Sequence, residues 1–234
     1  MKPKGIFGAK FLFAGKEEEV ICKFNEVEMS RDVEYEKNIY TEIQKGRSRG
    51  ATGCVYMFAT EGPSLVIEDF GTDIRPYLTN ENEVLKTFLP KMAAAVNALH
   101  TCGYVHGDIK PQNFLCKDQG LGRFDFKLCD LDSATKIGET FKTSKFTQRW
   151  VCPEVYLAFI EGREFVIAQA CMDMFNFGHL AGAILHNSKH PEMHLLPECV
   201  DDLVAEYKDQ PRLCGLIPCG GRLDYKVWVD QMCR

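Results

Sequence analysis

Residues 106–113 read His-Gly-Asp-Ile-Lys-Pro-Gln-Asn, and residues 130–132 read Asp-Leu-Asp. Two short apolar runs lie between these stretches, and the connection between the runs contains two glycines. This pattern predicts a strand, a turn and a returning strand. Because a hairpin brings its two ends together, we expect Asp108 and Asn113 to lie near Asp130.

The residue types at the ends of this hairpin suit a particular chemistry. Two carboxylates and an amide provide the hard oxygen ligands that Mg²⁺ prefers, and proteins usually hold Mg²⁺ with few of their own groups plus substrate phosphates. A carboxylate set slightly apart from the cation can accept a proton from a hydroxyl nucleophile. The alternative interpretation is a β-hairpin whose ends are polar by chance.

The same residues resemble the catalytic core of the eukaryotic-type protein kinase family, whose catalytic loop reads H-R-D-x-K-P-x-N and whose metal motif reads D-F-G. The resemblance implies that Asp108 accepts or orients the proton of the substrate hydroxyl. It implies that Lys110 stabilises the transferring phosphoryl group, and a lysine here marks the Ser/Thr-directed branch. Asn113 and Asp130 would hold Mg²⁺.

Two positions depart from the family pattern. Gly107 replaces the arginine that normally pairs with a phosphate on the activation segment. Leu131 and Asp132 replace Phe-Gly, and the loss of that glycine removes backbone freedom. Hydroxyls such as that of Thr143 are candidate phosphorylation sites in this segment, but without the arginine we expect no control by its phosphorylation.

The first 25 residues predict two strands joined by a polar turn at 15–19. Gly5 and Gly8 resemble the second and third glycines of the family's nucleotide loop, and Pro3 occupies the position of the first. Glycines allow backbone N–H groups to approach a phosphate closely. Lys23 ends an apolar strand and resembles the lysine of V-A-I-K, which points at nucleotide phosphates. A snorkelling lysine at a strand end is the alternative.

A helix is predicted over residues 31–45, where apolar residues recur at the spacing of one buried face. The resemblance implies that a glutamate of this helix pairs with Lys23. Glu36 fits that position, and Glu34 is the second choice. For either residue the alternative is a glutamate on a solvated helix face.

Two further strands are predicted over residues 54–59 and 65–70. In the resemblance Ile67 lies beside the adenine pocket. The segment from Glu68 to Phe70 is the hinge, whose backbone would hydrogen-bond the base.

The carboxy-terminal half is predicted to be mainly helical. Apolar residues recur at helical spacing over 83–100, with a start or kink expected at Pro90. Residues 147–154 resemble the G-T-x-x-Y/W-x-A-P-E segment that shapes the peptide-substrate platform, and Thr147 would contact the catalytic loop. Asp173 resembles the aspartate of D-x-W-S-x-G, which anchors the backbone of that loop.

The composition is that of an ordinary globular protein, with 234 residues, 45% hydrophobic and 26% charged. A net charge of −5 provides no basic field for nucleic acid or an anionic membrane. No run approaches the roughly 20 apolar residues of a membrane span. Eleven scattered cysteines without a Cys-x-x-Cys pair favour buried thiols in a reducing compartment. We therefore expect a soluble cytoplasmic or nuclear protein that binds neither nucleic acid nor membrane. Its oligomeric state is not indicated.

Together these observations predict an α+β protein with the bilobal protein-kinase-like fold over residues 1–234. Residues 1–70 would form a small antiparallel sheet with one helix, and 71–234 a larger, mainly helical lobe. The predicted activity is transfer of the ATP γ-phosphate, with Mg²⁺, to serine or threonine of a protein substrate. The alternatives are a pseudokinase that serves as a scaffold or nucleotide-binding module, and a small-molecule kinase of the aminoglycoside or choline type.

Overall fold

A computed structural model describes residues 4–25, 31–58, 64–75, 83–145, 147 and 150–187. The α-helices of this part are α1 (Arg31–Gln44), α2 (Glu83–Thr101), α3 (Pro153–Ile160) and α4 (Ala170–Asn187). The strands are β1 (Lys4–Phe13), β2 (Lys16–Asn25), β3 (Leu65–Glu68), β4 (Thr72–Asp73), β5 (Tyr104–Val105), β6 (Phe114–Asp118), β7 (Phe124–Leu128), β8 (Thr135–Lys136), β9 (Thr140–Lys142) and β10 (Phe165–Ile167). The mixed α+β class is as predicted.

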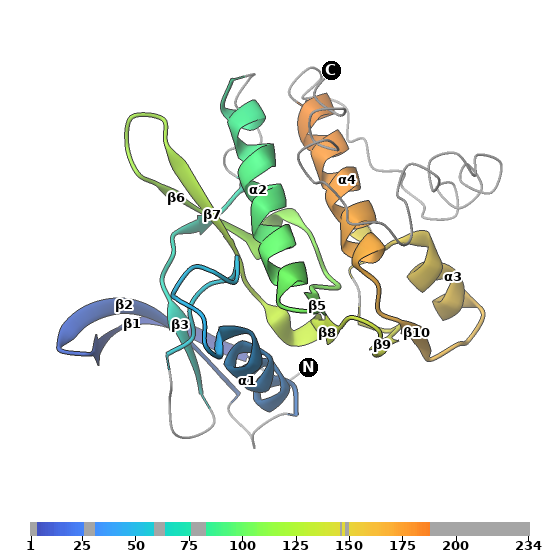
Figure 1. Ribbon diagram of the computed structural model, residues 1–234, viewed down its shortest axis with the longest axis horizontal. Coiled ribbons are helices and arrows are strands. Elements are labelled where there is room, and N and C mark those ends of the chain that lie inside the picture. The colour runs from blue at the N-terminus through green and yellow to red at the C-terminus, as the bar shows by residue number, and fades with distance from the viewer. Residues whose placement is uncertain are drawn as a thin grey trace.

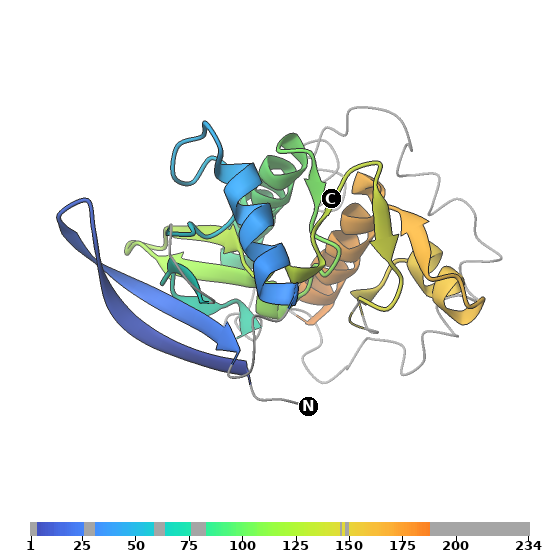
Figure 2. The same ribbon diagram turned by 90° about the horizontal axis from the view of Figure 1, so that it is seen from below.

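The amino-terminal strands form an antiparallel sheet in the order β1-β2-β3. The β1–β2 hairpin extends away from the rest of the protein, and α1 lies near its base (Figure 2). The connection between its strands is only Ala14 and Gly15, both with positive φ, of 49° and 78°. The predicted turn at 15–19 was therefore too long, because Lys16–Glu19 continue the β ladder opposite β1.

The predicted strand at 54–59 is not formed as a regular strand. The backbone N–H of Val55 donates to Leu128 of β7 at 2.9 Å, whereas that of Phe58 donates to Val66 of β3 at 2.9 Å. Because this segment changes its bonding partner between these two residues, it makes only isolated bridges. Ala59 lies outside the described residues.

Helix α2 passes through Pro90 instead of beginning there. Proline removes one helical hydrogen bond, but α2 buries Phe88, Leu89, Met92 and Val96, and burial of an apolar face stabilises a helix more than local propensity does. The helix ends before Gly103, whose φ is 87°. Helices α2 and α4 run side by side in Figure 1.

The hairpin that the sequence predicts after the catalytic loop is present as β6 and β7, paired from Phe114↔Leu128 to Asp118↔Phe124. Gly120 and Gly122 lie in its connection with φ of 79° and 70°. The main core packs this hairpin against α1, α2 and α4, so the two ends of the hairpin lie at the centre of the protein (Figure 1).

The seven cysteines in the described ranges are all unpaired thiols. None of the helices that the structure describes has both the length and the apolar character needed to cross a bilayer. From the sequence we also expect two short helices near residues 198–208 and 223–233, and both lie outside the described residues.

Candidate active site

The catalytic-loop backbone is held by the buried carboxylate of Asp173 on α4. Its Oδ2 accepts from the backbone N–H of His106 at 2.6 Å, and its Oδ1 accepts from that of Gly107 at 2.8 Å. The ring of His100 on α2 contributes a third contact, 2.8 Å from Nε2 to Oδ2. Burial acts to raise the pKa of Asp173, but these partners outweigh it and the pKa lies below its usual range. The anchoring role predicted for Asp173 is confirmed, and its partner His100 is an addition.

The side chain of His106 connects the loop to the end of the hairpin. Its Nε2 lies 3.0 Å from the carbonyl oxygen of Cys129, and its Nδ1 accepts from the backbone N–H of Asp108 at 3.3 Å. The residue is fully buried. It therefore acts as a structural link between Asp108 and Cys129, the residue that precedes Asp130.

Lys23 on β2 bridges two carboxylates from distant parts of the chain. Its Nζ lies 2.8 Å from Oε2 of Glu36 and 2.5 Å from Oδ1 of Asp130. The side chains of Lys23 and Glu36 are 12% and 2% exposed, so this ion pair is largely shielded from water, whereas the Asp130 side chain is 38% exposed. Glu36 is the α1 glutamate expected to pair with Lys23, and its Oε1 also accepts from the backbone N–H of Leu131 at 3.0 Å.

Asp130 has the left-handed backbone conformation, with φ 64° and ψ 67°. A non-glycine residue rarely adopts this conformation, and such strain persists only where surrounding contacts impose it. Here the contacts are those of Lys23 with the Asp130 carboxylate and of Glu36 with the next amide. Burial acts to raise the pKa of Asp130, but the Lys23 ammonium outweighs it, so the pKa is lowered and the group is a carboxylate at neutral pH.

Asp108, Lys110 and Asn113 meet within the catalytic loop. The Lys110 ammonium is bonded to Oδ2 of Asp108 and to Oγ1 of Thr147, the latter at 2.9 Å. Nδ2 of Asn113 donates to the carbonyl oxygen of Asp108 at 2.8 Å. The other carboxylate oxygen of Asp108, Oδ1, is buried and has no hydrogen-bond partner among the described residues. An unoccupied buried acceptor of this kind can receive the proton of a substrate hydroxyl.

The donor set at the end of the hairpin fits Mg²⁺. The Asp130 carboxylate is ionised and 38% exposed, so one ligand reaches the surface of the site. Asn113 uses its nitrogen on the Asp108 carbonyl, which leaves its amide oxygen as the ligand atom. The chain segments that carry the two residues are joined, because the amide of Cys129, next to Asp130, donates to the Asn113 carbonyl oxygen at 3.0 Å. One carboxylate and one amide oxygen, completed by phosphate oxygens, are a typical Mg²⁺ environment.

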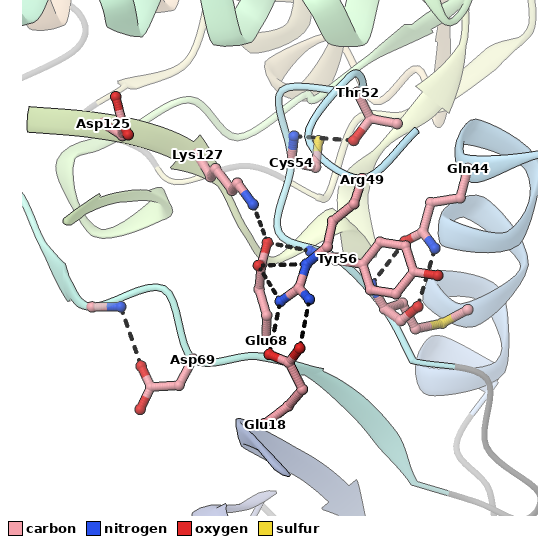
Figure 3. Close-up of polar contacts among 12 residues, drawn as sticks. Glu18, Gln44, Arg49, Thr52, Cys54, Tyr56, Glu68, Asp69, Asp125 and Lys127 are labelled. Atoms are coloured by element: carbon pink, nitrogen blue, oxygen red, sulfur yellow. Dashed lines mark hydrogen bonds and ion pairs between the residues drawn. The ribbon is translucent and has the colours of Figure 1, made fainter. Parts of the chain in front are cut away.

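The side chains of Glu68 and Phe70 in the predicted hinge contact other protein side chains. The carboxylate of Glu68 is bonded to Arg49 and Lys127 (Figure 3). The centroid of the buried Phe70 ring lies 4.5 Å from the Lys127 ammonium. The backbone N–H of Asp69 donates to Glu19 of β2 at 3.0 Å. Recognition of a base by the backbone of Glu68 and Phe70 stays a prediction. Neither Arg49 nor Lys127 was singled out from the sequence.

Gly5 and Gly8 lie within β1, opposite Phe24 and Ile21 of β2. They are part of a continuous ladder and not of a turn. A Cβ at Gly8 would meet no atom within 4 Å, so nothing among the described residues covers this position. Their role as a phosphate-binding pair stays a prediction.

The place of a side chain at position 107 is taken by an aromatic ring. Gly107 has φ 78°, and a Cβ built on it would lie 2.4 Å from Cε2 of Phe141 and 3.0 Å from the carbonyl oxygen of Ser133. Phe141 belongs to β9 and is buried. The segment after Asp130 is therefore packed against the catalytic loop by an apolar contact at the position where the family has its arginine.

Gly107→Ala is expected to lower the free energy of unfolding by about 2–4 kcal/mol, from left-handed strain and overpacking together. Urea unfolding measures this change. Gly138→Ala is the matched control, because Gly138 has a comparable φ of 89° but open space around its Cβ position. Equal losses in the two variants would show that the Phe141 contact does not matter.

The hydroxyl of Thr143 is structural. The residue is 3% exposed, and its Oγ1 donates to the carbonyl oxygen of Arg163 at 2.7 Å. Thr143→Ala should therefore cost about 1 kcal/mol of stability. It should leave the rate of phosphoryl transfer within about threefold of wild type, because Gly107 offers no group to bind a phosphate. A rate assay beside the exposed control Thr140→Ala tests this, and a drop above about tenfold in Thr143→Ala alone would contradict it.

Comparisons with known proteins agree with this geometry. A family model described as "Protein kinase domain" matches residues 4–194. The chain is 31% identical over 136 residues to serine/threonine-protein kinase MRCK gamma of Mus musculus, a match covering 52% of this chain and 8% of that relative. It is 30% identical over 89 residues to the chloroplastic serine/threonine-protein kinase STN7 of Arabidopsis thaliana, covering 36% and 15%.

Serine/threonine-protein kinase ArnS of Sulfolobus acidocaldarius is 29% identical over 133 residues, covering 52% of this chain and 20% of the relative. The matched regions thus span a fifth or less of these curated relatives, whereas the family model spans most of this chain. The residues of the catalytic loop, the metal motif and the Lys23–Glu36 pair all fall inside that match. The chain belongs to the protein kinase domain family.

Proposed function

We propose that this chain is an active protein kinase that transfers the γ-phosphoryl group of ATP to serine or threonine hydroxyls of proteins. The observation that carries the proposal is the Lys23 ammonium, which joins Glu36 and Asp130 in one ion-pair cluster. The cluster brings the predicted phosphate-binding lysine to the predicted metal ligand. The division into lobes at residue 70 is part of the same proposal.

The chemistry follows from the loop around Asp108. The substrate hydroxyl oxygen forms a bond to the γ-phosphorus while the bond from phosphorus to the β–γ bridging oxygen breaks, and the hydroxyl proton passes to Oδ1 of Asp108. Lys110, held between Asp108 and Thr147, carries positive charge to the transferring group. Asn113 and Asp130 would hold Mg²⁺, which when bound neutralises charge on the phosphate oxygens. Alignment and charge neutralisation are the main requirements of phosphoryl transfer.

The test is transfer of labelled γ-phosphate from ATP with Mg²⁺, offered separately to a generic protein and to aminoglycoside and choline acceptors. Labelled phosphoserine or phosphothreonine on protein is the expected product. Nucleotide binding without transfer would favour the scaffold alternative, and labelling of a small molecule alone would favour the small-molecule kinase.

The Mg²⁺ site has its own test in Asp130→Asn. Loss of the carboxylate should raise the Mg²⁺ concentration that gives half-maximal transfer by about 10- to 100-fold. Asp132→Asn is the matched control two residues away, because Asp132 accepts from Ser133 and an asparagine retains that acceptor. A Mg²⁺ titration that shifts equally in both variants would argue against Asp130 as the ligand.

A further inference from the structure

The carboxylate of Glu68 is a buried junction of three chain segments (Figure 3). Its Oε2 accepts from Nη2 of Arg49 at 2.9 Å, and its Oε1 accepts from the backbone N–H of Tyr56 at 2.7 Å. The Lys127 ammonium is also bonded to Oε1. We call Glu68, Arg49 and Lys127 the Glu68 clasp.

Arg49 extends the clasp to the amino-terminal sheet. Its guanidinium donates to both carboxylate oxygens of Glu18 on β2, at 3.1 and 3.3 Å. It also lies over the rings of Tyr56 and Phe58, 5.3 and 5.4 Å from their centroids. A planar guanidinium with two carboxylates and two aromatic faces is fixed in orientation and not only in charge.

Lys127 reaches the clasp from the other side, from β7. That strand ends at Leu128, two residues before Asp130. Beside Lys127, the backbone of Leu128 is paired with the 53–55 segment: its N–H donates to Gly53 at 2.8 Å, and its carbonyl accepts from Val55 at 2.9 Å. The clasp and this pairing together join the hinge strand β3 to β7, the strand that leads to Asp130.

Burial and the two neighbouring cations have opposite effects on the pKa of Glu68. Burial acts to raise the pKa of Glu68, but the Lys127 and Arg49 cations outweigh it, so the pKa lies below its usual range. The carboxylate is buried, and the two cations together with the backbone N–H of Tyr56 favour its ionised form. The Lys127 side chain is only 14% exposed, so removal of its ammonium weakens the junction by more than the loss of an exposed ion pair would.

We propose that the Glu68 clasp is a positioning device that sets the spacing between the backbone of the hinge and the carboxylate of Asp130. The inference rests on the proposed function, in which the hinge meets the base of ATP and Asp130 meets its metal-bound phosphates. Neither Arg49 nor Lys127 touches the nucleotide in this scheme. Both act through the two strands that they join.

The proposal distinguishes ligands that span both ends of the site from ligands that do not. Mg·ATP must contact the hinge and Asp130 at once. Its affinity therefore falls if the distance between the hinge backbone and the Asp130 carboxylate varies. Adenosine contacts the hinge end alone, so its affinity is independent of that spacing. The ratio of the two dissociation constants therefore reports the clasp, whereas a general loss of stability would not change it.

The decisive variant is Lys127→Met, which keeps an unbranched apolar side chain but removes the ammonium, and with it the bond to Glu68 and the contact with the Phe70 ring. Equilibrium binding to the full chain should show Mg·ATP weakened by about fivefold or more, with adenosine unchanged within about twofold. Lys91→Met is the matched control, because Lys91 also contacts β7, through Phe124 and Asp125, but does so from α2. It should change neither constant.

Hydrogen exchange of peptides that contain the Val55 and Leu128 amides tests, without nucleotide, whether the clasp stabilises the pairing of β7 with the 53–55 segment. Exchange should be faster in Lys127→Met than in Lys91→Met. Unchanged exchange, equal weakening of both ligands, or tighter Mg·ATP binding would each overturn the proposal. A wild-type chain that binds neither ligand would contradict the proposed function, and the exchange result would still decide whether the clasp holds the two strands together.

Discussion

Asp108→Asn is expected to slow phosphoryl transfer to protein by about 10²- to 10⁴-fold, the usual contribution of a positioned general base. The substitution keeps the size of the side chain and an oxygen for Lys110, so the loop should remain intact. What it removes is the anionic oxygen Oδ1, the buried acceptor that has no partner among the described residues. The amide that replaces it cannot take a proton from a hydroxyl at neutral pH.

The measurement is kcat for labelled transfer, with the dissociation constant of Mg·ATP determined separately. We expect kcat to fall while that constant stays within about twofold, because Asp108 acts on the acceptor hydroxyl and not on the nucleotide. Asp125→Asn, an exposed aspartate on β7, is the control. A loss of less than about tenfold in kcat would remove Asp108 from the role of base.

Asp173→Ala is expected to destabilise the protein by about 3–5 kcal/mol, which is a large part of the stability of a typical domain. The carboxylate is fully buried and accepts from two backbone amides, while His100 is its third partner. Alanine leaves all three without their acceptor in the core. Each buried donor left unsatisfied costs about 1–3 kcal/mol.

Urea unfolding of Asp173→Ala and Asp173→Asn measures this effect. The asparagine variant should lose less, because its amide oxygen still accepts one bond. Asp125→Ala removes a carboxylate whose Lys91 partner is 3.7 Å away at the surface, so it should cost less than about 1 kcal/mol. Similar losses of unfolding free energy in the Asp173 and Asp125 variants would show that the buried contacts of Asp173 contribute no more to stability than a surface ion pair does.

The anchor also predicts the acid limb of stability. Because the native pKa of Asp173 is lowered, its contribution is complete above the unfolded value of about 4 and is lost as pH falls through the native value. Wild type should therefore lose stability more steeply below pH 4 than Asp173→Ala does. The slopes of unfolding free energy against pH compare the two.

Two parts of this site were predicted from the sequence, one from a local pattern and one from the resemblance to the family. The hairpin of β6 and β7 follows from two short apolar runs around glycines, and the pairing of Lys23 with Glu36 follows from the resemblance to the family. The prediction of a strand at 54–59 was wrong, because the residue types of a short apolar run do not reveal that the segment changes its bonding partner midway.

The contacts missed from the sequence join residues far apart in the chain. His100 reaches Asp173 across 73 positions, and Lys127 reaches Glu68 across 59. A histidine near a helix end and a lysine in a strand have many ordinary explanations, so no local pattern marks them. The only signal available was the need of a buried carboxylate for partners, which indicates that partners exist but not which residues they are.

The contact between the Phe141 ring and Gly107 restricts which residues homologues can have at positions 107 and 141. The two positions compete for one volume, so neither can gain atoms unless the other loses them. In an alignment of close homologues, a residue larger than glycine at 107 should coincide with a small residue at 141. Homologues with Gly107 and Phe141 together would then be those in which an aromatic ring takes the place of the arginine that the family has in this loop.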